Sequence, residues 1–174
     1  MASDVFKIAG DFTSHYEDES GEYFNPDRDT WTAYDDPLKP GIATLGPGLT
    51  GSLGEEEIQA GSEYPSELIS EEYGKRLQTD YDLLERNVGE RWKDYNPNQQ
   101  AAVLSLMHNV GSGNLLKSDA FKALKSGNVE AFIYEAFDPE DGFVKSGGET
   151  ARGLQRRRQA ERDLFLKPMA ENAF

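Results

Sequence analysis

The segment from Pro97 to Gly111 limits the possible folds of this chain more than any other. Pro97 suits the first turn of a helix, and Gly111 suits the position just after its end. Between them, the run from Ala101 to Met107 is apolar on almost every side. A helix that is apolar all round must be covered by other elements. The sequence therefore predicts a buried central helix with further helices packed around it.

Helix patterns also precede and follow this segment. From Val5 to Glu17, apolar residues recur on one helical face. Ser70 is a plausible N-cap, and apolar residues then recur at spacings of three and four up to Val88. The remaining predicted helices lie between Ser118 and Gly127, from Asn128 to a point before Pro139, and from about Thr150 to Phe165.

The first part of the chain is predicted to form a small lobe with short strands. Residues 18–29 are polar, acidic and interrupted by Gly and Pro, which indicates a loop. Two short strands are predicted between Trp31 and Leu45, around a turn at 37–41, and one more near Ile58. In this hairpin the carboxylate pair Asp35–Asp36 lies opposite the hydroxyl of Thr44, a pairing suited to holding one water molecule.

Three separate patterns, in the right order, resemble the phage-type lysozymes (glycoside hydrolase family 24). The hairpin matches at Tyr34, Asp36, Gly41, Thr44, Leu45, Gly46 and Gly48. The central helix matches along Gln100-Ala-Ala-Val-Leu-Ser-Leu-Met-His-Asn-Val-Gly111. The last helix matches at Gly153, Leu154, Arg157, Arg158, Glu161 and Leu164. The resemblance implies one lysozyme-like α+β domain over residues 1–174, with a small lobe at about 1–66, a helical lobe at about 67–174, and a cleft between them.

The resemblance also implies a set of catalytic residues. Hydrolysis of a glycoside needs one protonated carboxyl that donates to the leaving oxygen and a second, ionised carboxyl. Glu17 corresponds to the proton donor, Asp36 to the carboxylate that activates water, and Thr44 to the hydroxyl that holds that water. The C-terminal end of a helix disfavours an ionised carboxylate, so the predicted place of Glu17 raises its pKa and suits an acid.

The spacing leaves other candidates for the acid. The family has about eight residues between its Glu and its Asp, whereas Glu17 and Asp36 are much further apart, so residues 18–30 are interpreted as an insertion. Strict spacing would select Asp27, and Glu19 and Glu22 are further candidates.

Polar residues of the helical half have two possible roles. The resemblance implies that Arg156 or Arg157 pairs with the acidic Glu. For the basic cluster from Arg152 to Arg162 as a whole, a solvated helix face is the expected role. Asn109 is interpreted as part of the sequence that ends the helix, and a second interpretation is that its side chain reaches the cleft.

Composition excludes several classes of function. The chain has no Cys and two His, which excludes a thiolate site and leaves too few ligands for a site built from His. No metal or organic cofactor is implied. The net charge of −14 falls entirely on residues 1–99, which argues against broad nucleic-acid binding. No apolar run approaches a membrane span, and no basic-then-apolar leader is present, so synthesis in the host cytoplasm is expected.

The predicted function is therefore a muramidase that hydrolyses the β-1,4 bond between N-acetylmuramic acid and N-acetylglucosamine. A monomeric phage endolysin that reaches the periplasm and wall after membrane permeabilisation is the leading role. A virion tail lysozyme is the enzymatic alternative. A wall-binding or tail structural module that kept the fold and lost the acid is the non-enzymatic alternative.

Overall fold

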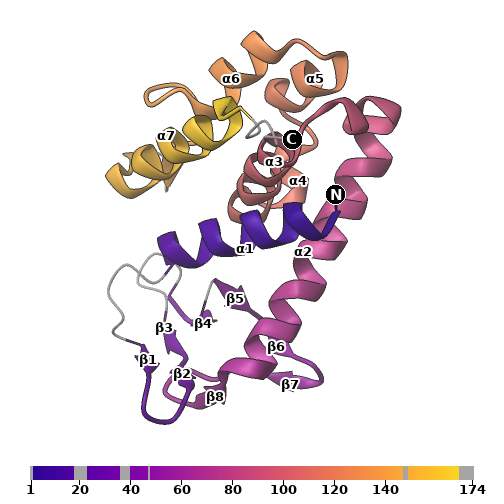
Figure 1. Cartoon of the computed structure of the whole chain (residues 1–174). Helices are drawn as coiled ribbons and strands as arrows, with labels where there is room; N and C mark the ends of the chain where they lie inside the picture. The colour runs from indigo at the N-terminus through magenta and orange to yellow at the C-terminus, as the bar shows by residue number, and fades with distance from the viewer. Residues whose placement is uncertain (1, 18–22, 36–39, 47, 147–148, 169–174) are drawn as a thin grey trace. The chain divides into compact units, whose positions relative to one another are not determined.

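The computed structural model describes residues 2–17, 23–35, 40–46, 48–146 and 149–168 (Figure 1). The α-helices are α1 Ala2–Glu17, α2 Ser66–Val88, α3 Pro97–Val110, α4 Ser112–Leu115, α5 Asp119–Ser126, α6 Val129–Phe137 and α7 Arg152–Leu166, with a 3-10 helix, η1, at Gly89–Asp94. The strands are β1 Phe24–Asn25, β2 Thr30–Thr32, β3 Tyr34–Asp35, β4 Ala43–Leu45, β5 Leu49–Thr50, β6 Ser52–Leu53, β7 Glu56–Glu57, β8 Glu63–Pro65, β9 Lys145–Ser146 and β10 Glu149–Thr150. The combination of helices and small antiparallel sheets confirms the predicted α+β class.

The chain divides into two compact units, which we call the helical unit and the small unit. The helical unit comprises residues 1–9 and 77–174, and the small unit comprises residues 10–76. Helices α1 and α2 each contribute residues to both units.

Helix α3 is the core of the helical unit, as predicted. Residues 100–107 are buried without a break. Asn96 caps the helix through a reciprocal capping box with Gln99, Pro97 occupies the first turn, and the helix ends at Gly111 with a φ of +84°. Helix α7 packs along α3, and α5 and α6 complete the bundle (Figure 1).

Aromatic side chains fill the space between these helices. The ring of Phe165 on α7 lies 5.2 Å from that of Phe132 and 6.0 Å from that of Phe137, both on α6. All three are essentially fully buried. Burial of each such side chain contributes roughly 1.5–3 kcal/mol, so the end of α7 is held mainly by apolar contact.

The small unit is built from short antiparallel strands. One sheet has the order β1-β2-β8, a second has the order β3-β4-β5, and β6 pairs with β7. Its apolar core includes Ala33, Leu45, Leu49, Ile58 and Ile69. Strands of two or three residues bury few side chains each, so this core depends on the first turns of α2 for its remaining apolar contacts.

Three sequence predictions for this region are wrong in part. The predicted loop at 18–29 contains strand β1, which pairs with β2, while residues 18–22 lie outside the described ones. Helix α2 begins at Ser66 rather than at Ser70. The short strand predicted near Ile58 corresponds to β7, but β5, β6 and β8 were not predicted, because runs of two and three residues are too short to produce an alternating pattern.

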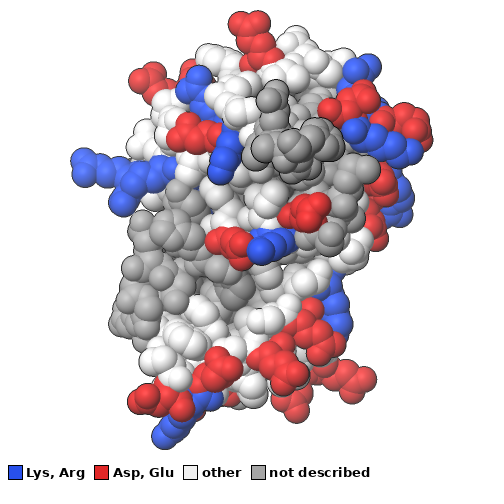
Figure 2. All heavy atoms as spheres, viewed as in Figure 1, with Lys and Arg blue, Asp and Glu red and all other residues white. Residues whose placement is uncertain are grey.

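Carboxylates dominate the described surface of the small unit. In the lower part of the face seen in Figure 2, acidic side chains gather with few basic ones among them. Arg28 is a basic residue of this unit, and its Nη1 lies 3.2 Å from Glu63 Oε2 in an exposed ion pair. The negative charge predicted for the first half of the chain therefore lies largely at the surface of this unit.

Candidate active site

The hairpin that carries Thr44 is formed by strands β3, β4 and β5. Tyr34 lies opposite Thr44 and Asp35 lies opposite Ala43. Thr44 in turn lies opposite Thr50 on β5. The backbone N–H of Gly41 donates a hydrogen bond of 2.9 Å to Asp35 Oδ1, which closes the start of the turn. Asp35 thus has the turn-forming role that Asp commonly takes before a Pro/Gly turn.

The Thr44 side chain is buried and lacks a hydrogen-bond partner. Its exposed fraction is 5%, and its Oγ1 contacts no donor or acceptor among the described residues. Burying a hydroxyl without a partner costs roughly 1–3 kcal/mol. A catalytic role and an internal water molecule are two explanations for such a group, which Thr44 shares with other buried groups such as Thr30 Oγ1 and Ser66 Oγ.

Gly46 allows the chain to leave β4 against the core of the small unit. Its φ is +51°, and a Cβ at this position would lie 3.0 Å from Ile69 Cγ2 and 3.8 Å from Trp31 Cδ2. Both the backbone conformation and the available space therefore require glycine here.

We expect Gly46→Ala to destabilise the protein more than Gly54→Ala. Gly54 has a similar φ of +64°, but a Cβ added there would have no atom within 4 Å, so its substitution carries only the backbone cost of about 1–2 kcal/mol. Crowding against Ile69 adds about 1–3 kcal/mol at residue 46. Urea unfolding of the two variants measures the difference, and equal free energies of unfolding would show that the Ile69 contact is relieved without cost.

The candidates for the acid fall in different parts of the chain. Glu17 is the last residue of α1, as the sequence predicts, although its side chain lies outside the described part. Glu19, Glu22 and Asp36 also lie outside the described residues. Asp27 is described: it is exposed in the turn between β1 and β2, and its backbone N–H donates to Asn25 Oδ1.

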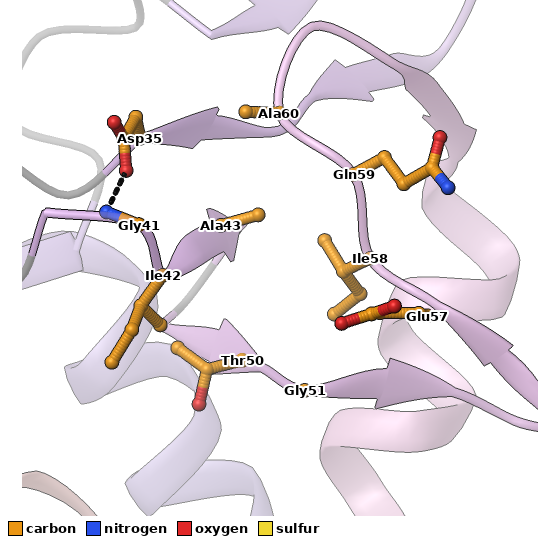
Figure 3. Close-up of a pocket in the computed structure, with 10 residues that line it drawn as sticks. All are labelled: Asp35, Gly41, Ile42, Ala43, Thr50, Gly51, Glu57, Ile58, Gln59 and Ala60. Atoms are coloured by element: carbon orange, nitrogen blue, oxygen red, sulfur yellow. Dashed lines mark hydrogen bonds between the residues drawn. The ribbon is translucent and has the colours of Figure 1, made fainter.

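A pocket of about 700 Å³ lies beside the hairpin (Figure 3). Ala43 and Ile58 contribute apolar side chains to it, and Asp35 and Glu57 contribute carboxylates. Side chains alternate along a strand, and residues directly opposite each other share a face. Asp35 and Ala43 are therefore on the hairpin face opposite to that of Tyr34 and Thr44. The pocket is also lined by Thr50, which lies directly opposite Thr44, so it extends along both faces of this sheet.

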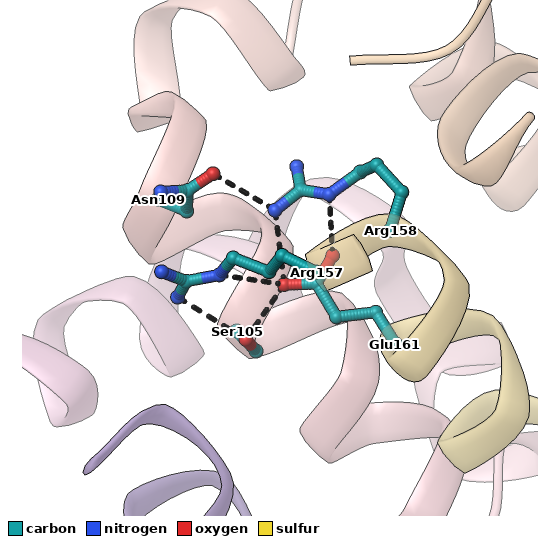
Figure 4. Close-up of polar contacts among 5 residues, drawn as sticks. All are labelled: Ser105, Asn109, Arg157, Arg158 and Glu161. Carbon is teal, nitrogen blue, oxygen red and sulfur yellow. Dashed lines mark hydrogen bonds and ion pairs between the residues drawn. The ribbon is translucent and has the colours of Figure 1, made fainter. Parts of the chain in front are cut away.

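The motif residues of α3 and α7 form a buried polar cluster in the helical unit (Figure 4). Glu161 Oε1 accepts hydrogen bonds from Ser105 Oγ at 2.8 Å, from Arg158 Nη2 at 3.1 Å and from Arg157 Nε at 3.2 Å. Arg158 Nε lies 2.8 Å from Glu161 Oε2, and Arg158 Nη2 also donates to Asn109 Oδ1 at 2.8 Å. We call Ser105, Asn109, Arg157, Arg158 and Glu161 the α3–α7 cluster.

Burial dominates the electrostatics of this cluster. Glu161 and Arg158 are fully buried, and Arg157 is 5% exposed. Burial lowers the pKa of the Arg158 guanidinium to about 10, although Glu161 acts in the opposite direction. Burial also raises the pKa of the Glu161 carboxyl above its ordinary value, although Arg158 and Arg157 oppose this. Both directions reflect the free energy needed to bring these charges out of water, which their mutual contacts offset.

The α3–α7 cluster corrects the sequence interpretation of the basic residues. The solvated helix face predicted for Arg152 to Arg162 is wrong for Arg157 and Arg158, which are buried. Asn109 lies near the helix end as predicted, and its side chain accepts from Arg158. The available signal was the position of Glu161 four residues after Arg157 and three after Arg158, which places all three on one helical face.

The described part of the chain contains neither a candidate metal site nor a candidate membrane-spanning helix. Its side chains include no group of three or more His, Cys, Asp or Glu arranged to hold a metal ion. Within the same residues, no helix combines the length and the apolar character needed to cross a membrane.

Known proteins resemble this chain in sequence and in fold. An endolysin of Bacillus phage B103 is 35% identical over 112 residues, which make up 63% of this chain and 41% of that endolysin. This chain therefore matches about two fifths of that relative's length. A SAR-endolysin of Enterobacteria phage P21 is 28% identical over 127 residues, covering 72% of this chain and 70% of that protein.

The fold has a solved counterpart of similar size. The crystal structure of a mutant of P22 lysozyme superposes with a TM-score of 0.61 at 27% identity, over 90% of this chain and 96% of that one. The family model for phage lysozyme matches residues 30–161. That range contains the Thr44 hairpin, the central helix and every residue of the α3–α7 cluster, and this chain belongs to the phage lysozyme family.

Proposed function

We propose that the chain is a muramidase that hydrolyses the β-1,4 bond between N-acetylmuramic acid and N-acetylglucosamine in peptidoglycan. The observation that carries the proposal is the buried Thr44 hydroxyl, which has no partner among the described residues and lies on a hairpin that matches the family pattern. A hydroxyl that is costly to bury fits a role in holding a reacting water molecule. Membership of the phage lysozyme family and the endolysin relatives support the substrate.

The proposed mechanism uses three residues. Protonated Glu17 donates its proton to the glycosidic oxygen as the bond from that oxygen to the anomeric carbon breaks. Asp36 accepts a proton from a water molecule held by Thr44, and the water oxygen attacks the anomeric carbon. The end of α1 at Glu17 supports this assignment, because a helix C-terminus favours the protonated form of a carboxyl. The exposed turn position of Asp27 offers no comparable environment.

Direct attack by water implies inversion at the anomeric carbon. In such sites the two carboxyl groups are about 6.5–9.5 Å apart, which leaves room for the water between them. The fresh reducing end is then released as the α-anomer.

Thr44→Val should separate catalysis from stability. Valine keeps the shape of threonine and removes an oxygen that has no hydrogen-bond partner among the described residues. We expect the free energy of unfolding to stay equal or to rise by about 1–3 kcal/mol, while the rate of wall hydrolysis falls roughly 100-fold because the water is no longer positioned. Chemical denaturation and initial rates on the same preparation measure both quantities.

Thr44→Ser is the matched control, since it retains the hydroxyl and should retain most of the activity. If Thr44→Val hydrolyses walls at the wild-type rate, Thr44 has no part in the reaction and the proposed water position is incorrect.

The proposed biological role is host lysis by an endolysin made in the host cytoplasm and acting on the wall after the membrane is permeabilised. The endolysin relatives favour this role over a virion tail lysozyme. In the same proposal the protein is a monomer that acts on a glycan strand. Its two lobes are residues 1–66 and residues 67–174. The acidic surface of the small unit argues against a nucleic-acid partner (Figure 2).

A turbidity assay on purified peptidoglycan distinguishes the enzyme from an inactive wall-binding module. The proposal predicts that the purified protein clears the suspension and releases soluble fragments. Binding to the sedimented wall without clearing would instead support the structural module.

A further inference from the structure

Tyr23 stacks on the hairpin from outside it. The ring centroids of Tyr23 and Tyr34 are 4.2 Å apart, and the ring planes differ by 19°. The backbone N–H of Thr32 donates a hydrogen bond of 2.7 Å to the Tyr23 carbonyl, which fixes Tyr23 beside the end of β2. The position of Tyr23 is therefore set by both its backbone and its ring.

This stacking places Tyr23 on the hairpin face of the candidate site. Tyr34 lies directly opposite Thr44, and residues directly opposite each other in an antiparallel pair point to the same face with Cβ atoms about 4.5–5.5 Å apart. The stacked rings are thus neighbours of the position at which Thr44 is proposed to hold water.

The Tyr23 side chain has unused binding capacity. It is partly exposed. One face of its ring stacks on Tyr34. A tyrosine of this kind offers a flat apolar ring face together with a polar tip. The apolar C–H face of a pyranose ring and its hydroxyl or acetamido groups are complementary to these two features.

We propose that Tyr23 stacks against a sugar ring of the glycan strand and so acts as a specificity-determining residue. The inference rests on the proposed muramidase function and extends it to one position in sugar binding. Tyr23 precedes the range of residues 30–161 that matches the family model, and it belongs to the segment interpreted from the sequence as an insertion. The added segment thus supplies a contact that the matched part of the chain does not contain.

Kinetics of Tyr23→Leu and Tyr23→Phe on soluble glycan strands test the proposal. Leucine removes the ring, and we expect KM to rise roughly 5- to 20-fold with kcat changed less than about twofold, because stacking acts on substrate binding. Phenylalanine keeps the ring and should stay within about threefold of the wild-type KM. Tyr134→Leu is the matched control: Tyr134 is 54% exposed on α6, and its loss should leave KM unchanged.

An unchanged KM in Tyr23→Leu would overturn the inference. A fall in kcat at constant KM would also overturn it, since Tyr23 would then only position Tyr34. A rise in KM as large in Tyr23→Phe as in Tyr23→Leu would show that the ring does not carry the contact.

Equilibrium binding to the same strands, in a Glu17→Gln background, separates this inference from the proposed function. Weaker binding of Tyr23→Leu than of its Glu17→Gln parent would support the sugar contact, whether or not the wild-type protein hydrolyses peptidoglycan. A wild-type protein that hydrolyses no peptidoglycan would contradict the muramidase proposal and leave the sugar contact untouched. Equal binding of the two proteins overturns the sugar contact alone.

Discussion

Glu17→Gln is expected to lower the rate of peptidoglycan hydrolysis by roughly 10²- to 10⁴-fold while the fold is retained. The amide has nearly the same shape as the carboxyl and cannot donate a proton to the leaving oxygen. The measurement is the initial rate on purified peptidoglycan, with thermal unfolding of the same preparation to show that the loss is not one of stability.

The other carboxylates near this position provide the controls. Glu19→Gln, Glu22→Gln and Asp27→Asn should each keep most of the activity. If Glu17→Gln remains active and Asp27→Asn is inactive, strict spacing rather than an insertion describes this segment, and the acid belongs to the turn between β1 and β2.

Among all the substitutions proposed, Glu161→Gln is expected to lower the free energy of unfolding most. The substitution leaves the guanidiniums of Arg157 and Arg158 buried without the carboxylate that contacts both. Removing one partner of a buried ion pair typically costs about 3–5 kcal/mol. For a chain of this size the expected fall in Tm is roughly 6–20 °C, which calorimetry or circular dichroism measures.

Glu90→Gln is the matched control for this prediction. Glu90 Oε2 lies 2.9 Å from Lys93 Nζ at the same spacing of three residues, but the pair is exposed, so its loss should cost at most about 1 kcal/mol. Replacing Arg157, Arg158 and Glu161 together by apolar residues of similar volume should recover much of the lost stability. If Glu161→Gln is no worse than Glu90→Gln, the α3–α7 cluster contributes nothing net to folding.

The helices of this fold were predictable because their signals are local. Ser118 accepts from the N–H of Phe121, Asn128 accepts from that of Ala131, and Gly127 ends α5 with a φ of +78°. Each of these contacts joins residues three apart or depends on one residue alone. The run of α3 from Ala101 to Met107, apolar except for Ser105, likewise identified the centre of the helical unit, because an exposed helix does not carry apolar residues on almost every side.

The α3–α7 cluster was not predictable in the same way. The residues that make it are distant in sequence: Ser105 and Glu161 are 56 positions apart. The burial of Arg157 and Arg158 depends on the packing of α7 against α3. The apolar pattern of α7 alone does not show which of its arginines are buried and which are exposed to solvent. Strand β1 was missed for a related reason, since a pairing such as that of Phe24–Asn25 with Thr30–Trp31 is defined by its partner.

The residues of the candidate site were predicted from the sequence, whereas the environment of Thr44 became known only from the structure. The hairpin was predicted, but its register was not: Asp35 lies opposite Ala43, and Tyr34 rather than the carboxylate pair lies opposite Thr44. The burial of the Thr44 hydroxyl and the stacking of Tyr23 on Tyr34 depend on tertiary contacts. Glu17 at the end of α1 agrees with the helix predicted from residue 5. The catalytic roles of Glu17, Asp36 and Thr44 stay predictions.

The chemical identity of the new reducing end tests the muramidase proposal most directly. Purified peptidoglycan is digested, reduced with borohydride and hydrolysed in acid, and the resulting amino sugar alcohols are quantified over time. We predict that muramitol accumulates with the wild-type protein and stays at background with Glu17→Gln. Accumulation of glucosaminitol, or no new reducing ends at all, would contradict the proposal.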